Sequence, residues 1–163
     1  MRRVSLTDYR NLEWVKFMLE SVGLDMSQKR FRELAHLFMY LVCKADRDMR
    51  MRKAVYSQIE IDKDILRTLF SSKEGELMLK ERDESYGNTP LHIACSLHSI
   101  DFTRFMIEAG SDLTIKNLAE KTPEEVVDSE IENYSKHLHS EERDMILERL
   151  VQLKTVFPTK MTG

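Results

Sequence analysis

The chain has 163 residues, of which 42% are hydrophobic and 33% are charged, and its formal net charge is −3 at pH 7. This length suits one compact domain, or a short repeat array with a helical extension. Five Gly and three Pro give few turn signals, which favours long helices over many short strands. No stretch is long and uncharged enough to span a bilayer, and we expect neither a signal peptide nor a membrane anchor.

The charge is distributed unevenly along the chain. Residues 1–53 hold 12 Lys or Arg against 7 Asp or Glu, whereas residues 54–163 hold 13 against 21. The basic part is densest at residues 47–53, which suggests a nucleic-acid-binding module as one hypothesis. The alternative is a solvated helix end whose cations complement the helix dipole. We favour this alternative because the run lacks the aromatic residues on which single-stranded nucleic acids stack.

Two amphipathic helices are predicted within residues 1–50, from Thr7 to Val22 and from Ser27 to about Lys44. Stripes this broad must be covered, so the helices either cap one end of a helical array or mediate assembly, and we favour the cap. The apolar stripes comprise Leu12, Val15, Met18, Leu19 and Val22 in the first helix, and Phe31, Leu34, Ala35, Phe38, Leu41 and Val42 in the second.

An internal repeat follows, because Thr89-Pro90 recurs 33 residues further on as Thr122-Pro123. The first copy spans residues 84–116 and predicts two helices, one beginning at Thr89-Pro90 and one from about Asp101 to Ala109. Thr suits a helix N-cap and Pro the first helical position, and Gly110 suits a left-handed residue after the second helix. The residues predicted to face the core are Leu91, Ala94, Cys95, Phe102, Phe105 and Met106.

This segment resembles an ankyrin repeat, whose signature T-P-L-H-x-A is unbroken at residues 89–94. The resemblance implies an all-α fold, an ankyrin-repeat α-solenoid with helices flanking it at both ends. It also implies that His92 is a structural core histidine, bonding within and between repeats. The residues given structural roles in this way are Thr89, Pro90, Leu91, His92, Ala94, Gly110, Thr122 and Pro123.

Less regular copies are predicted on both sides of this repeat. Residues 117–128 keep the hairpin and the helix start, but they carry Glu120 where the family has glycine and Glu124-Glu125 where it has Leu-His. Losing apolar packing at residues 124–125 is typical of a terminal repeat whose outer face meets water. Upstream, residues 53–60 and 62–71 predict the helices of a degenerate repeat, followed by a long loop at residues 72–82. Its expected buried residues are Ile65, Leu66, Leu69 and Phe70.

The predicted organisation therefore has four parts: an N-terminal helical element at 1–50, ankyrin repeats at 51–128, C-terminal capping helices at 129–155 and a tail at 156–163. The capping helices are expected at residues 129–139 and 140–154. The second has a wide apolar face, made by Met145, Ile146, Leu150, Val151 and Leu153.

No catalytic or cofactor motif stands in the sequence, since phosphate-binding loops, nucleophile elbows and zinc-type spacings are absent. His137 and His139 are interpreted as surface residues rather than metal ligands. Cys43 and Cys95 are interpreted as buried free thiols, which are typical of the reducing cytoplasm or nucleus. We expect no enzyme activity, no metal and no cofactor.

The resemblance implies that the chain binds another protein through its hairpin tips and the exposed side of its first helices. Tyr86 and Leu118 are the strongest candidates, because exposed aromatic and aliphatic side chains anchor interfaces. The alternative for each is packing between neighbouring hairpins. The full set of candidates is Ser85, Tyr86, Asn88, Leu118, Ala119 and Lys121 at the tips, and Ser96, Leu97, Ser129 and Glu130 on the helices.

The predicted function is that of a non-enzymatic adaptor or regulator. A narrower version is an inhibitor of a transcription factor, similar to the inhibitors of Rel proteins. Two alternatives stay open: a nucleic-acid-binding module acting through residues 1–53, and a structural protein that dimerises through residues 5–45. We favour a monomer that binds protein rather than nucleic acid.

Overall fold

A computed structural model describes residues 75–137 and 139–159, together with Met39, Tyr40, Cys43, Lys44, Arg47, Lys63, Asp64, Leu66, Arg67, Phe70 and Ser71. The continuous part contains five helices: α5 (Gly75–Lys80), α6 (Pro90–Ser96), α7 (Ile100–Glu108), α8 (Pro123–Ser135) and α9 (Glu141–Lys154). The described residues contain no strand. The all-α fold predicted from the sequence is confirmed for this part of the chain.

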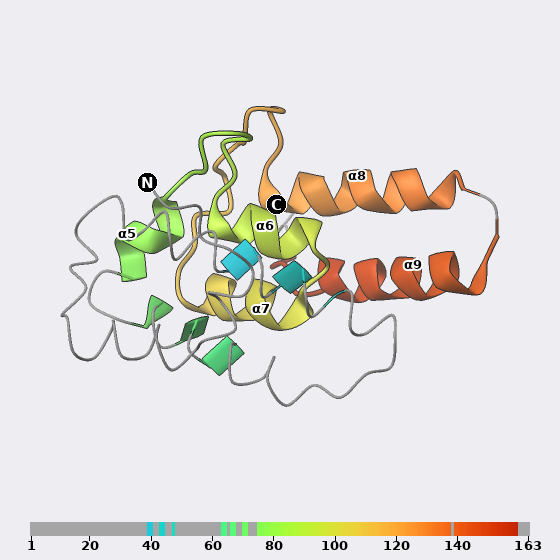
Figure 1. Cartoon of the computed structure of the whole chain (residues 1–163), viewed down its shortest axis with the longest axis horizontal. Coiled ribbons are helices and arrows are strands. Elements are labelled where there is room, and N and C mark those ends of the chain that lie inside the picture. The colour runs from blue at the N-terminus through green and yellow to red at the C-terminus, as the bar shows by residue number, and fades with distance from the viewer. Residues whose placement is uncertain are drawn as a thin grey trace, which may run out of the picture.

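The four longer helices form two antiparallel pairs, α6 with α7 and α8 with α9, and the pairs stack side by side (Figure 1). In the stack, α6 packs against α8 and α7 packs against α9. The loops that precede α6 and α8, drawn green and orange, project from the same side of the stack (Figure 1). The helices of one pair therefore pack on the helices of the next, and the two loops lie side by side, as expected of an α-solenoid.

The helices α6 and α8 begin with the same capping chemistry, which explains the 33-residue recurrence in the sequence. At α6, the Thr89 side chain accepts a hydrogen bond from the His92 backbone N–H, and His92 Nδ1 accepts one from the Thr89 backbone N–H at 3.1 Å. At α8, the Thr122 side chain accepts a hydrogen bond from the Glu125 backbone N–H, and Glu125 Oε2 accepts one from the Thr122 backbone N–H at 2.8 Å. Each pair of bonds satisfies N–H groups that have no partner within the helix.

The core runs continuously from the first helix pair into the second. Every residue predicted to face inward from α6 is buried, and Phe102 and Met106 of α7 are fully buried, with Phe105 partly so. Val127 continues this core into α8. Gly110 follows α7 with a φ of +96°, the left-handed conformation predicted for it.

The apolar face of α9 is narrower than predicted. Leu150 and Leu153 are buried and Ile146 is partly buried, but Met145 and Val151 are 53% and 54% exposed. The apolar face predicted for this helix includes these two residues, but they do not contribute to the described core. The described neighbours of α9, which are α8 and α7, cover the stripe of residues 146, 150 and 153, and Met145 and Val151 lie outside it.

Two elements differ from the predicted boundaries. The segment expected to be a loop at residues 72–82 contains α5, which buries Met78 and Leu79. The boundary expected at residues 128/129 falls inside α8, which is one continuous helix. Val127, Ile131 and Tyr134 explain the continuation, because their spacing keeps an apolar stripe on one face of the helix. The cap-like repeat and the capping helices thus form a single elongated helix pair.

The described residues upstream of α5 join the same core. Leu66 and Phe70 are buried as predicted, and Met39 and Cys43 are fully buried in the same cluster. The predicted stripes of residues 12–22 and 31–42, together with Ile65 and Leu69, lie outside the described residues. Whether the N-terminal helices cap the stack or mediate assembly stays a prediction.

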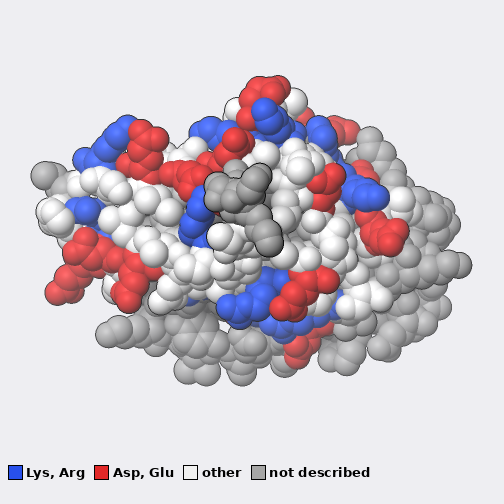
Figure 2. Space-filling view, turned by 180° about the vertical axis from the view of Figure 1, so that it is seen from behind, with Lys and Arg blue, Asp and Glu red and all other residues white. Residues whose placement is uncertain are grey.

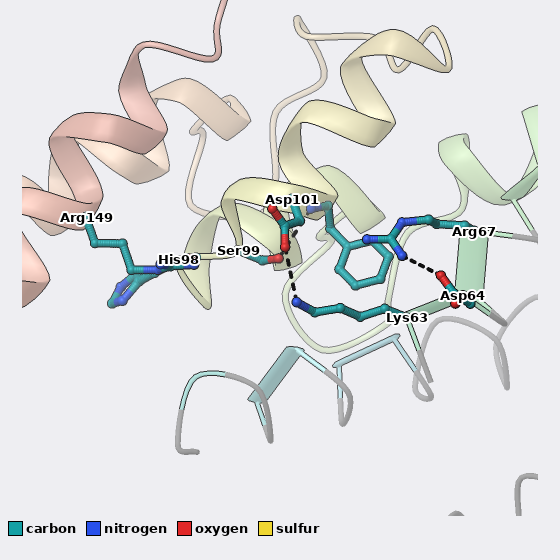
Figure 3. A network of polar contacts seen from close by, with 8 residues as sticks. Lys63, Asp64, Arg67, His98, Ser99, Asp101 and Arg149 are labelled. Carbon is teal, nitrogen blue, oxygen red and sulfur yellow. Dashed lines mark hydrogen bonds and ion pairs between the residues drawn. The ribbon is translucent and has the colours of Figure 1, made fainter. Parts of the chain in front are cut away.

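A polar seam accompanies this upstream packing (Figure 3). Lys63 is almost completely buried, and its Nζ lies 3.2 Å from the Asp101 carboxylate at the start of α7. The Arg67 guanidinium lies over the Phe102 ring, 5.7 Å from its centroid. Both contacts join the described helical residues Lys63 and Arg67 to α7, so these two residues lie beside the second helix of the repeat.

The first prediction concerns the contact between the helices. Ala94 is fully buried in α6, and replacing it with leucine adds three carbons to a filled core. We expect Ala94→Leu to lower the free energy of unfolding by about 1–3 kcal/mol. Urea denaturation measures the change, with Ala119→Leu as the control, because Ala119 is exposed. Equal stability of the two variants would contradict the packing described above.

Candidate protein-binding surface

Two large apolar side chains stand at the tips of the loops that precede α6 and α8. Tyr86 is 69% exposed and Leu118 is 70% exposed, which makes them the most exposed large hydrophobic residues of the described chain. The Leu118 backbone N–H donates to the Tyr86 carbonyl at 2.9 Å. The structure thus brings together the two residues that the sequence singled out as interface anchors.

The first loop closes between Asp83 and Asn88. The Asp83 carboxylate accepts from the Tyr86 backbone N–H at 2.6 Å, and the Asp83 backbone N–H donates to the Asn88 carbonyl at 2.9 Å. Gly87 has a φ of +66°, and a Cβ placed on it would lie 3.0 Å from Leu118 Cγ and 3.1 Å from the Leu118 backbone nitrogen. A glycine is needed here both for the turn and for the close approach of the second loop.

The second loop makes the corresponding turn without a glycine. Glu120 has a φ of +59°, the conformation that Gly87 adopts 33 residues earlier. Asn117 holds this turn, since its side-chain oxygen accepts from the backbone N–H groups of Ala119 and Lys121 at 3.0 and 3.1 Å. The departure from the family pattern at Glu120 therefore changes the residue and keeps the backbone shape.

His92 joins the two loops from beneath. Its Nδ1 accepts from Thr89, so Nε2 carries the proton and donates to the Lys121 carbonyl at 2.9 Å. Burial lowers the pKa of His92 below the ordinary value of 6.5, although the bond to Lys121 acts in the opposite direction. Both ring nitrogens are engaged, and this geometry gives His92 a structural role.

The remaining candidates are placed as follows. Ser85 and Ala119 are exposed at the tips, and Asn88 is half-buried between the loops. Leu97 is only 5% exposed and belongs to the core, so it offers no surface to a partner. It directly follows α6, where the chain turns inward towards α7.

The polar helix candidates are bound to neighbouring residues. Ser96 Oγ donates to the Ile93 carbonyl, and Lys121 Nζ donates to Ser129 Oγ at 2.6 Å. Glu130 Oε2 lies 3.3 Å from His98 Nε2. Of these contacts, the Lys121–Ser129 bond continues the surface of the tips onto α8.

Sequence reasoning missed Asn117, which organises the second loop. Its residue type was the available signal, because Asn side chains bond to backbone N–H groups a few residues further on and so favour turns. What the sequence did not indicate is the second bond of this side chain, from Asn117 Nδ2 to Asn88 Oδ1 at 3.0 Å. That bond crosses between loops that are 29 residues apart.

Comparison with known proteins gives one family. Residues 86–118 match the family model of the ankyrin repeat. The chain carries an ankyrin repeat. The matched residues begin and end within two positions of the repeat predicted from the sequence, and an ankyrin repeat is a protein-interaction module. No curated protein matches the chain.

The charges around the ankyrin repeat are mixed. Figure 2 shows Lys and Arg interspersed with Asp and Glu over one face of the described residues, with no broad area of a single sign. No group of three His, Cys, Asp or Glu in the described part of the chain is arranged to hold a metal ion. None of the described helices has the length and apolar character needed to cross a membrane.

The second prediction concerns the strained turn of the second loop. A left-handed conformation costs a non-glycine residue about 1–3 kcal/mol, and a glycine at the same position avoids this strain. Glycine also gives the unfolded chain more conformational freedom, which cancels part of the stability gained. We expect Glu120→Gly to raise the free energy of unfolding by roughly 1 kcal/mol. Ala119→Gly serves as the control and should lower it, because Ala119 has no positive φ. A loss of stability in both variants would count against the strain at Glu120.

The third prediction concerns the pH dependence of stability. Because burial keeps the pKa of His92 low, the unfolded chain binds the proton more readily than the folded chain does. The contribution of neutral His92 is complete above pH 6.5 and is lost as the pH falls towards its folded pKa. Urea titrations across this range should show a smaller loss of stability in His92→Asn than in the wild type. The exposed His139 provides the control variant His139→Asn, which should behave like the wild type. If stability depends on pH in His92→Asn as steeply as in the wild type, the lowered pKa assigned to His92 is overturned.

Proposed function

We propose that the chain is a non-enzymatic adaptor or regulator that binds another protein through its loop tips. The observation that carries this proposal is the exposure of Tyr86 and Leu118, which adjoin each other at the ends of two neighbouring loops. Aromatic and large aliphatic side chains in such positions supply most of the binding energy of interfaces when a partner buries them. The ankyrin repeat beneath them is itself a protein-interaction module.

We define the tip surface as Tyr86 and Leu118 together with Ser85, Asn88 and Ala119. The small and polar members suit a rim, since they exclude water around the anchors without adding charge. The surface extends along α8 through Lys121 and Ser129, which are already bonded to each other. Ser96 and Glu130 lie at its margin in this proposal, and Leu97 is left out because it is buried.

A nucleic-acid partner has less support. Phosphate binding requires clustered cations, and the described residues on the face in Figure 2 carry both signs of charge. The basic residues 1–53, on which the nucleic-acid hypothesis depends, lie almost entirely outside the described residues. Cys43 and Cys95 are buried thiols that form no disulfide, which supports a place in the cytoplasm or nucleus, where thiols stay reduced. We further propose that the chain acts as a monomer without metal or cofactor.

The fourth prediction tests the tip surface by affinity capture from a cell extract treated with nuclease. We expect Tyr86→Ser combined with Leu118→Ser to reduce recovery of the bound protein at least about tenfold, because each lost anchor costs more than 1 kcal/mol. The control combines Met145→Ser with Val151→Ser, a pair of similarly exposed apolar residues on α9. Both variants should unfold within about 0.5 kcal/mol of the wild type, as surface substitutions do.

Recovery lost in the control but kept in the tip variant would move the binding surface to α9. A parallel capture from untreated extract tests the nucleic-acid alternative, which would be favoured if recovery there falls steeply with salt and is abolished by nuclease. The recovered protein also decides the narrower hypothesis, because an inhibitor similar to those of Rel proteins must capture a transcription factor.

A further inference from the structure

The two loops of the tip surface are joined by side chains as well as by backbone. The Leu118 backbone N–H donates to the Tyr86 carbonyl, and beside this bond Asn117 Nδ2 donates to Asn88 Oδ1 at 3.0 Å. Both asparagines are half-buried, and each precedes or follows one of the anchors by one or two residues. The bridge therefore joins the two loops next to Tyr86 and Leu118 in the sequence.

Asn117 uses both ends of its amide. The oxygen accepts from Ala119 and Lys121, which shapes the second loop, and the nitrogen donates to Asn88, which ties that loop to the first. A carboxylate provides only acceptors and a hydroxyl is too small to reach three partners, so an amide suits this position best. One side chain thus sets both the shape of the second loop and its distance from the first.

We propose that Asn117 is a positioning residue of the tip surface, acting through its bond to Asn88. This inference rests on the proposed function, and it adds how the two anchors are presented. The bridge holds Tyr86 and Leu118 at one separation, so a partner protein meets them as a single preformed site. Anchors that are ordered before binding lose less conformational entropy when the partner arrives.

The bridge is separate from the contacts that hold the helices together. The core of the described residues consists of apolar side chains and includes neither asparagine. The first loop is closed independently by Asp83 and the second by the acceptor oxygen of Asn117. Removing the bond between the loops should therefore leave the helix stack intact and release the tips from each other.

The test uses Asn88→Ala in the full chain, because this change removes the acceptor of the bridge and leaves the loop bonds of Asn117 in place. Hydrogen exchange of the Leu118 amide, followed by NMR, reports on the bond to the Tyr86 carbonyl. We expect this amide to exchange about tenfold faster, with exchange in α6 and α9 unchanged. Ser85→Ala, a change at an exposed residue of the same loop, should leave Leu118 unaffected.

Unchanged exchange at Leu118 would overturn the proposal. Faster exchange throughout α6 and α9 would overturn it as well, since the bridge would then support the fold rather than position the tips. Both results are obtained without a partner protein, so they stand whatever the capture experiment shows.

Binding provides the second measurement. The affinity for the protein that the wild type captures should fall about three- to tenfold in Asn88→Ala, although both anchors remain. An unchanged affinity would overturn the positioning role. If the variant lacking Tyr86 and Leu118 keeps full affinity, the proposed function fails, and the exchange of Leu118 still decides whether the bridge couples the loops.

Discussion

The imidazole of His92 is bonded at both of its nitrogens, and the arrangement of the two helix pairs depends on these bonds. Nδ1 completes the cap of α6, and Nε2 fixes the Lys121 carbonyl at the base of the neighbouring loop. Because the ring is fully buried, a nitrogen left without a partner would carry the cost of an unsatisfied polar group. A single side chain therefore couples the start of one helix to the position of the next loop, and through that loop to Leu118.

Sharp turns keep α6 and the loop before α8 close enough for His92 to bond to both. Gly87, Glu120 and His98 all have positive φ values, and the last two do so with a side chain. The strained backbone of His98 is stabilised by two contacts. Arg149 Nε donates to the His98 carbonyl at 2.8 Å (Figure 3), and the His98 ring packs edge-on against the Tyr134 ring. Strained conformations persist where neighbouring contacts fix them in this way. At His98 those contacts come from α8 and α9, so the turn that ends α6 is held by the second helix pair.

The sequence predicted what depends on local chemistry and missed what depends on neighbours. Thr89-Pro90 and Thr122-Pro123 predicted both helix starts correctly, because the hydrogen bonds of a helix cap join residues only three or four positions apart. The six residues of α5 are too few to show a helical period, so its position could not be predicted. Leu97, Met145 and Val151 have apolar side chains of similar character, and only the placement of α7, α8 and α9 decides which is covered. The bond between Asn88 and Asn117 could not be predicted either, because it depends on how two loops 29 residues apart are placed. The exposure of Tyr86 and Leu118 could be predicted, because it follows from the loop geometry of the family.

The second helix pair is much longer than the first, with 13 residues in α8 and 14 in α9 against 7 in α6 and 9 in α7. At 1.5 Å per residue, α8 extends about 9 Å further than α6, and Figure 1 shows the pair projecting beyond its neighbours. The connection at its far end is exposed at Lys136, His137, His139 and Ser140. Exposed connections accept inserted sequence when the flanking helices keep their own contacts, as α9 does through Leu150 and Leu153. A fluorescent domain placed between residues 137 and 140 would therefore sit away from the loop tips, and the chain could be tracked in cells with its tip surface unobstructed.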